Sequence, residues 1–365
     1  MGSYFRRSRP AWIVLWIDAF VLLAWFLLRG DRALMNRVAG VTAHYRAFAG
    51  RLSALVPFSV NDAAYAALVL GALAFVICSA VAVIRNPGRR WSLALSRLTV
   101  LACAAVTLYT AFCLLWGVNY YTDNFRDHSG LRDEPISVDT LEEVTRCFAD
   151  GLCASADTVA RDENGVFAVP RGEILAAAPE IYRGVAAEYP FLAGEDAPPK
   201  GMFFSRIMSA LNFTGVYLAF TGESGVNVDS PACLLPSTAA HELAHRRGYA
   251  EEEECSFIGI LACLRSDNAA YRYSGYLDGF IYLSNALYRA DRERWEAVYR
   301  TLPETVLADL RDNNAYWARF ETKAAAVTDR VYDAMLRSYG QELGSQSYGA
   351  VVDLLAAYYR AGNRF

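Results

Sequence analysis

His241-Glu242-Leu243-Ala244-His245 is the stretch of this chain whose residue types and spacing could do chemistry. Two histidines four residues apart lie on one face of a helix, so both imidazoles can reach one zinc ion. Glu242 is placed to take a proton from a metal-activated water molecule. The chain contains four histidines, and this motif holds two of them. We therefore predict a helix that carries two zinc ligands, His241 and His245, and a catalytic general base, Glu242.

A catalytic zinc ion needs a third protein ligand and leaves one coordination position open. The two remaining histidines are distant in sequence, so an acidic ligand is expected instead. The run Glu251–Glu254 can supply it, because Gly248 turns the chain back toward the helix that it has just left. We rank Glu252 first, then Glu254, then Glu251. The alternative is that these carboxylates only stabilise the N-terminus of the next helix.

The segments around the motif predict a mostly helical soluble domain with a small β element. Gly215–Phe220 and Val226–Val228 have the composition of short strands, and they precede the motif helix. Ser237 or Thr238 is the expected N-cap of that helix, and Gly248 its C-terminal cap. The expected fold class is mainly α.

Three long apolar segments near the N-terminus predict transmembrane helices, at about 11–28, 63–84 and 98–116. Each approaches the roughly 20 residues that cross a bilayer. Asp18 lies inside the first segment, where a carboxylate that faces lipid is costly, so we expect it to face another helix or the interface. The first segment is longer than the core of a signal peptide, and we expect it to remain as an anchor.

Charge divides the chain near residue 117. Residues 1–117 carry twelve Arg and three Asp, a net charge of +9, whereas the remainder carries a net charge of −13. We therefore predict a membrane domain over 1–117 and a soluble domain over 118–365. Arginine is densest before the first span and between the second and third, which predicts a cytoplasmic N-terminus and an extracytoplasmic soluble domain. No basic patch with interleaved aromatic residues is present, so nucleic acid is not an expected partner.

Four stretches resemble the domain-of-unknown-function 3810 family, which comprises bacterial membrane proteins with a zincin-like motif. These stretches are Trp116–Tyr120, Phe220–Glu223 with Val226–Val228, His241–Gly248 with Glu252 and Glu254, and Tyr273–Tyr276 with Ser347–Gly349 and Val352–Leu354. In the family pattern the two glutamates are followed by Ala-Asn-Phe, whereas here Cys255-Ser256-Phe257 follow. The departure leaves Ser256, in place of Asn, to make a weaker hydrogen bond to a zinc ligand.

The resemblance implies a zinc metallopeptidase with a zincin-like α+β fold, in which a glutamate completes the metal site as in gluzincins. Such enzymes hold an extended peptide against an edge strand, and Gly215–Phe220 or Val226–Val228 is the candidate edge. Tyr273 is a candidate for stabilising the oxyanion, and Glu223 and Asn227 are candidates for shaping the site. The alternative for these three residues is a structural role in the core or in turns.

The expected function is therefore hydrolysis of peptide or protein substrates by a multi-pass protein of the cell membrane, with Zn²⁺ as cofactor. Two other functions remain open. One is a non-catalytic membrane protein whose zinc site is structural and closed by four protein ligands. The other is a zinc hydrolase that acts on a non-peptide component of the cell envelope.

Overall fold

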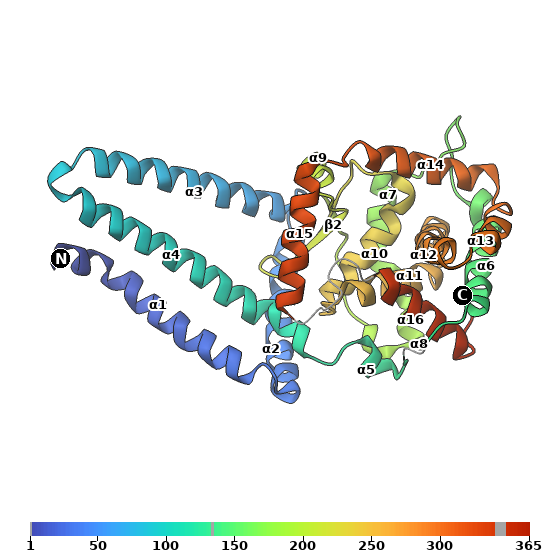
Figure 1. Cartoon of the computed structure of the whole chain (residues 1–365), viewed down its shortest axis with the longest axis horizontal. Coiled ribbons are helices and arrows are strands. Elements are labelled where there is room, and N and C mark those ends of the chain that lie inside the picture. Colours follow the sequence, from blue (N-terminus) through green and yellow to red (C-terminus); the bar gives the residue numbers. More distant parts are fainter. Residues whose placement is uncertain (1, 133–134, 340–347) are drawn as a thin grey trace. The chain divides into compact units, whose positions relative to one another are not determined.

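The structure is a computed structural model that describes residues 2–132, 135–339 and 348–365; Ser347, in one of the family-like stretches, lies outside them. The chain is mainly helical, as predicted, with one small sheet (Figure 1). It divides into two compact units. Unit 1 comprises Met1–Arg46 and Val60–Thr122, and unit 2 comprises Ala47–Ser59 and Asp123–Phe365.

Unit 1 contains the three helices that are long and apolar enough to cross a membrane. They are α1 (Gly2–Leu28), α3 (Val60–Ile84) and α4 (Arg90–Leu115). Their positions confirm the three predicted spans. Asp18 of α1 is 6% exposed and accepts a hydrogen bond from Thr107 of α4 at 2.6 Å. Its carboxylate therefore faces a neighbouring helix, one of the two predicted positions.

A helix that no sequence pattern predicted, α2 (Arg32–Ala54), connects α1 to α3. Four arginines and a histidine lie within α2, and their density resembles that of a polar connector. The last turns of α2 and the segment up to Ser59 belong to unit 2. Unit 2 therefore begins earlier than the predicted boundary at residue 117 and receives this segment from between two spans.

Unit 2 is a helical domain built around three central helices, α10 (Leu235–Arg246), α11 (Glu252–Leu264) and α12 (Ala269–Ala290). Residues 254–264 of α11 are all buried, which agrees with the continuous apolar run from Phe257 to Leu264. The surrounding helices are α5 (Phe125–Ser129), α6 (Val138–Ser155), α7 (Arg171–Ala177), α8 (Tyr182–Glu188), α9 (Ser205–Ala210), α13 (Arg292–Tyr299), α14 (Glu304–Ala318), α15 (Lys323–Ser338) and α16 (Tyr348–Arg360).

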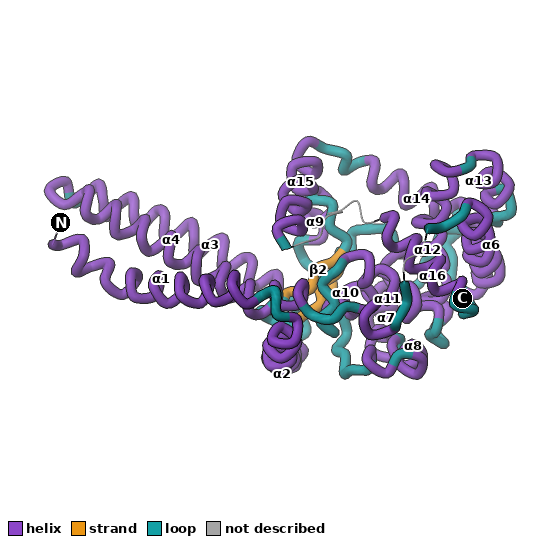
Figure 2. The backbone as a smooth tube through the Cα atoms, turned by 60° about the horizontal axis from the view of Figure 1, so that its bottom comes forward, coloured by secondary structure: helices purple, strands orange, loops and turns teal. Residues whose placement is uncertain are grey.

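The sheet has the strand order β1-β3-β2 and lies beside α10 (Figure 2). Its strands are β1 (Lys200–Gly201), β2 (Gly215–Leu218) and β3 (Glu223–Val226). β1 is parallel and β2 antiparallel to the central β3, and Gly215 pairs with Val226. The prediction placed the second strand at Val226–Val228, about three residues too late. The segment Thr221–Gly225 has the composition of a turn, but its second half pairs with β2.

The helix that carries the histidine motif starts earlier than predicted. α10 begins at Leu235, so Ser237 and Thr238 lie inside its first turns and neither is the N-cap. Pro236 occupies the first turn, where its fixed φ suits a helix and its missing N–H costs nothing. The helix ends before Gly248, which has φ of 101°, and the chain returns as α11 from Glu252.

Candidate metal centre

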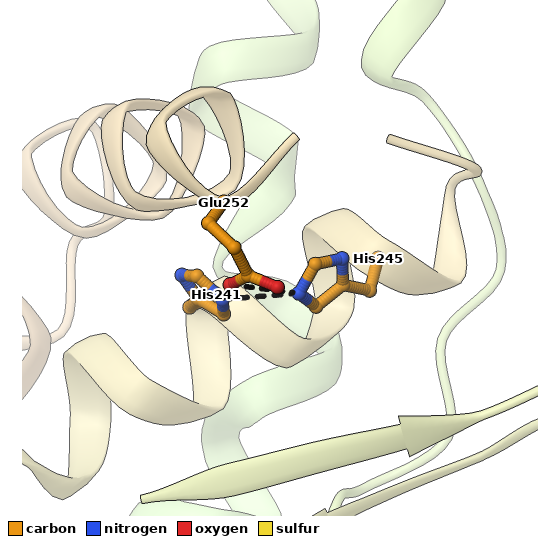
Figure 3. A group of neighbouring side chains, drawn as sticks. All are labelled: His241, His245 and Glu252. Atoms are coloured by element: carbon orange, nitrogen blue, oxygen red, sulfur yellow. Dashed lines mark hydrogen bonds and ion pairs between the residues drawn. The ribbon is translucent and has the colours of Figure 1, made fainter. Parts of the chain in front are cut away.

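Three side chains converge where α10 meets the first turn of α11: His241, His245 and Glu252 (Figure 3). His241 Nε2 lies 3.1 Å from His245 Nε2 and 3.1 Å from Glu252 Oε2. His245 Nε2 lies 3.6 Å from the same carboxylate oxygen. Among the residues that the structure describes, this is the group of donors arranged to hold a metal ion.

The donor set and its spacing fit zinc. Imidazole nitrogen and carboxylate oxygen bind Zn²⁺ at roughly 2.0–2.2 Å, so two ligands at tetrahedral corners lie about 3.3–3.5 Å apart. The three separations here, 3.1, 3.1 and 3.6 Å, are close to that value. Three protein donors would leave a fourth tetrahedral corner open to water or another small ligand.

Hydrogen bonds behind the histidines orient both imidazoles. His245 Nδ1 lies 2.9 Å from the carbonyl oxygen of Tyr249. A carbonyl oxygen can only accept, so Nδ1 carries a proton, and Nε2 is the nitrogen that can bind a cation at the centre once it is deprotonated. His241 Nδ1 lies 3.2 Å from Ser256 Oγ, in the position where the sequence predicted an outer hydrogen bond from this serine. Cys255 Sγ also approaches His245 Nδ1, at 3.2 Å.

Gly259 brings the two helices of the centre together. A Cβ at this residue of α11 would lie 3.0 Å from the backbone nitrogen of His241 and 3.2 Å from its Cα. A glycine at this point lets α11 run directly against the backbone of α10. Glu252, two helical turns earlier on α11, can therefore reach both histidines with its short side chain.

Electrostatics favour the ligating form of two of the three donors. Burial would raise the pKa of Glu252, but the charge of His245 and hydrogen bonds from both histidines outweigh it and hold that pKa well below its usual value. Burial lowers the pKa of His241. Burial also acts to lower the pKa of His245, yet Cys255 and Glu252 raise it well above its usual value. A cation that binds here therefore displaces a proton from His245.

Glu242 lies beside the three donors and is 4% exposed. Its Oε2 is buried, and none of the described residues offers it a hydrogen bond. Burial raises the pKa of this carboxyl to about 8. A buried carboxylate oxygen without a protein partner is energetically costly unless a ligand or a water molecule forms a hydrogen bond with it. A pKa raised to this range suits a group that takes up and releases protons near neutral pH.

The edge strand of the sheet covers Glu242. A Cβ on Gly215 of β2 would lie 2.3 Å from Glu242 Oε1. β2 pairs with β3 on one side, and no described strand pairs with its other side. Of the two candidate edges, Gly215–Leu218 is therefore the edge strand at this site. The alternative, Val226–Val228, is wrong, because Val226 belongs to the central strand β3.

The other candidate glutamates face away from the centre, toward α5. Glu254 is fully buried and accepts hydrogen bonds from the backbone of Phe125 at 2.7 Å and of Arg126 at 3.2 Å. It also pairs with the Arg126 guanidinium at 3.1 Å. Glu251 accepts from Asn124 at 3.3 Å. These two carboxylates bind the N-terminus of α5 and leave Glu252 as the carboxylate at the histidines.

Tyr273 lies in the core of unit 2. Its hydroxyl donates to Asp309, and its ring stacks on Phe167 with the centroids 5.8 Å apart. The side chain is fully buried. The structure thus gives Tyr273 the alternative, structural role and not a place among the metal-binding side chains.

Glu223 and Asn227 also have structural partners. Glu223 is 4% exposed, forms an ion pair with Lys200 at 2.8 Å and accepts a hydrogen bond from Ser59 at 2.9 Å. The Asn227 amide donates to the carbonyl oxygen of Phe213 at 3.0 Å, which fixes the loop that leads into β2. Both residues shape the sheet beside the site, and neither belongs to the group of metal-binding donors.

Tyr332 of α15 is a site residue that the sequence analysis missed. Its hydroxyl donates to Glu252 Oε1 at 2.5 Å, while Oε2 of the same carboxylate faces the histidines. The aromatic ring of Tyr332 lies edge-on to Phe213, with centroids 5.7 Å apart. Eighty residues separate Tyr332 from Glu252, and no local spacing connects them.

The chain was compared with models of known families, with curated proteins and with solved structures. A family described as a protein of unknown function, DUF3810, matches residues 39–356. No curated protein and no solved structure matches. The matched range includes the histidine motif, Glu252, Tyr332 and all four stretches that carried the resemblance. The chain therefore belongs to the DUF3810 family, as its sequence motifs predicted.

Proposed function

We propose that this protein is a membrane-anchored zinc metallopeptidase. The observation that carries the proposal is the convergence of His241, His245 and Glu252 beside a buried carboxylate, Glu242, that none of the described residues binds through Oε2. Three donors at zinc-like separations and an adjacent carboxylate are the parts that metal-assisted hydrolysis requires.

Each residue has a distinct task in this mechanism. The zinc ligands would be His241, His245 and Glu252. Zinc is a Lewis acid, and when bound it would make water nucleophilic near neutral pH. Glu242 takes a proton from the attacking water and then passes it to the leaving amine. Tyr332 holds Glu252 so that one carboxylate oxygen stays turned toward the histidines.

The edge strand β2 favours a peptide over a non-peptide substrate. On the side where none of the described strands pairs with it, β2 can bind an extended chain through backbone hydrogen bonds, as peptide-binding sheet edges do. Gly215 brings this strand into contact with Glu242, so a peptide aligned on β2 would pass beside the general base. An envelope component without a peptide backbone could not use these groups in the same way.

A structural zinc site is the main rival function. Such a site is closed by four protein ligands. Three donors converge among the described residues, and this number supports an open site.

The excess of arginine before the first span and between the second and third supports an extracytoplasmic location for the catalytic domain.

The test is Glu242→Gln in the full-length protein, purified in detergent and assayed against a peptide library. Peptidase activity should be lost, because an amide cannot take the proton. Metal analysis should still find about one zinc per chain, since Glu242 is not among the three donors. Full activity in this variant would refute the mechanism. Closure of the site by a fourth protein ligand would instead support a structural zinc.

A further inference from the structure

The connectivity of α2 constrains its orientation to the membrane. Three residues separate it from α1, and five separate it from α3, and both neighbours are long and apolar enough to be spans. Both ends of α2 therefore lie near the same face of the bilayer. A helix of 23 residues is about 34 Å long, and five residues reach at most about 20 Å. α2 cannot stand on end and must run along the membrane surface.

One face of α2 is apolar and exposed. Its residues follow a spacing of four and three, so they form a single stripe along the helix. They are Val41, Tyr45, Phe48, Leu52 and Leu55, which are 72%, 44%, 59%, 51% and 79% exposed. The last of them lies just beyond the end of the helix. Five large apolar side chains in one exposed stripe are unfavourable in water.

A row of basic residues borders this apolar stripe. Arg37, His44 and Arg51 are seven residues apart, and all three are exposed. Residues at this spacing lie on nearly the same side of a helix. Exposed arginines beside an apolar stripe suit the boundary of a bilayer, where the stems lie against acyl chains and the charges reach lipid phosphates. Arg51 also pairs with Glu195 at 3.3 Å.

The opposite side of the last turns of α2 is attached to the sheet of unit 2. Ser53 is buried and donates to the carbonyl oxygen of Thr221 at 2.8 Å. Lys200 donates to the carbonyl oxygen of Ser53 at 2.6 Å. A Cβ on Gly50 would lie 2.7 Å from the carbonyl oxygen of Gly222. These contacts fix the rotation of the last turns of α2 within unit 2, so Phe48, Leu52 and Leu55 lie on the exposed side of these turns.

Unit 2, to which the last turns of α2 belong, has other exposed apolar side chains close to the end of this helix. Lys200 donates to the carbonyl oxygen of Phe58 at 2.8 Å, so the segment after α2 lies beside β1. Phe58 is 59% exposed, and Phe203, just after β1, is 86% exposed. Ile207 of α9, one turn beyond, is 56% exposed. The surface is thus built from two distant parts of the sequence.

We propose that Phe48, Leu52 and Leu55 of the apolar stripe, together with Phe58, Phe203 and Ile207 of the same unit, form a lipid-contacting surface that lies in the boundary between headgroups and acyl chains. The length and tethering of α2 place it along the membrane, and the exposed stripe with its basic border selects lipid as the occupant. The proposal concerns lipid contact only and is independent of the proposed peptidase activity.

The test places an environment-sensitive fluorescent amino acid, one position at a time, in the full-length protein reconstituted into phosphatidylcholine–phosphatidylglycerol vesicles. Leu52, Leu55 and Phe203 are the test positions. Ala47 and Ala54 are the matched controls, because both are exposed on another side of the same helix. Quenching is measured with lipids brominated on their acyl chains.

We expect quenching at Leu52, Leu55 and Phe203 to be several-fold stronger than at Ala47 and Ala54. Weak quenching at all five positions would overturn the proposal. Strong quenching at all five would also overturn it, because the helix would then be immersed and not interfacial. A second copy of the chain on the stripe would give weak lipid quenching and energy transfer between labelled copies, which again contradicts lipid contact. Phe203 gives a reading that does not depend on α2 tolerating substitution.

Discussion

Gly215 of the edge strand lies directly against the carboxylate of Glu242, and a Cβ at this glycine would be 2.3 Å from Oε1. The absence of a side chain at Gly215 allows the strand to cover Glu242, the proposed general base. This contact joins the two parts of the proposed site, the strand that would align a peptide and the carboxylate that would transfer protons.

Gly215→Ala should therefore impair catalysis without removing the metal. The added methyl group has to displace the Glu242 side chain, and a misplacement of about 1 Å can cost roughly 100-fold in rate. The three metal donors are elsewhere, so zinc content should remain at the wild-type level. kcat/KM of the variant and of the wild-type protein is measured with a peptide that the wild-type protein cleaves, and the zinc content of both is measured by metal analysis.

Val216→Ala is the matched control for Gly215→Ala. Val216 is the next residue of β2, so its side chain points to the other face of the sheet. This variant should retain most of its activity. An unchanged rate in Gly215→Ala would contradict the role given to the contact with Glu242.

The assignment of the third ligand is tested by comparing Glu252→Gln with Glu251→Gln. Loss of a residue that is hydrogen-bonded to a metal ligand lowers metal affinity about 10- to 100-fold. Loss of a ligand itself should lower zinc affinity by at least about 100-fold. Zinc affinity, measured by competition with a chromogenic chelator, should fall accordingly in Glu252→Gln. It should change little in Glu251→Gln, because Glu251 faces Asn124. Equal losses in both variants would argue against Glu252 as the ligand.

The parts of the site that sequence could predict are those set by local spacing. His241 and His245 share a helical face, and the return of the chain after Gly248 limits which acidic residues can reach them. Glu252 was ranked first among three neighbours, but the bonds that draw Glu254 toward α5 come from a segment about 130 residues earlier. Tertiary contacts of this kind leave no periodic pattern in the sequence, so the sequence alone does not predict them.

Two further features escaped prediction for related reasons. Tyr332 reaches Glu252 only through the packing of α15, and nothing in its own segment distinguishes it from the other tyrosines. The helix α2 carries a narrow apolar stripe among arginines, so its average composition resembles a loop. The three spans and the core helix α11 were predictable because long or continuous apolar runs have few alternatives.

Tyr332→Phe tests the residue that positions Glu252. Removal of the hydroxyl leaves Glu252 Oε1 without the hydrogen bond that it now accepts at 2.5 Å. The carboxylate should become less well oriented, and zinc affinity should fall about 10- to 100-fold. Peptidase activity should return toward the wild-type value when zinc is added in excess. Loss of activity that excess zinc does not restore would show that Tyr332 acts directly on the substrate instead.

The buried ion pair between Lys200 and Glu223 should contribute strongly to the stability of unit 2. The side chains are 14% and 4% exposed, and Lys200 also donates to the carbonyl oxygens of Ser53 and Phe58. Lys200→Met leaves Glu223 buried without its counter-ion, which should cost about 3 kcal/mol in the free energy of unfolding. The double variant Lys200→Met/Glu223→Gln removes the buried charge and should recover part of that loss. Denaturant unfolding monitored by fluorescence in detergent measures both. If Lys200→Met had the same free energy of unfolding as the wild type, the ion pair would not stabilise the attachment of the segment after α2 to the sheet.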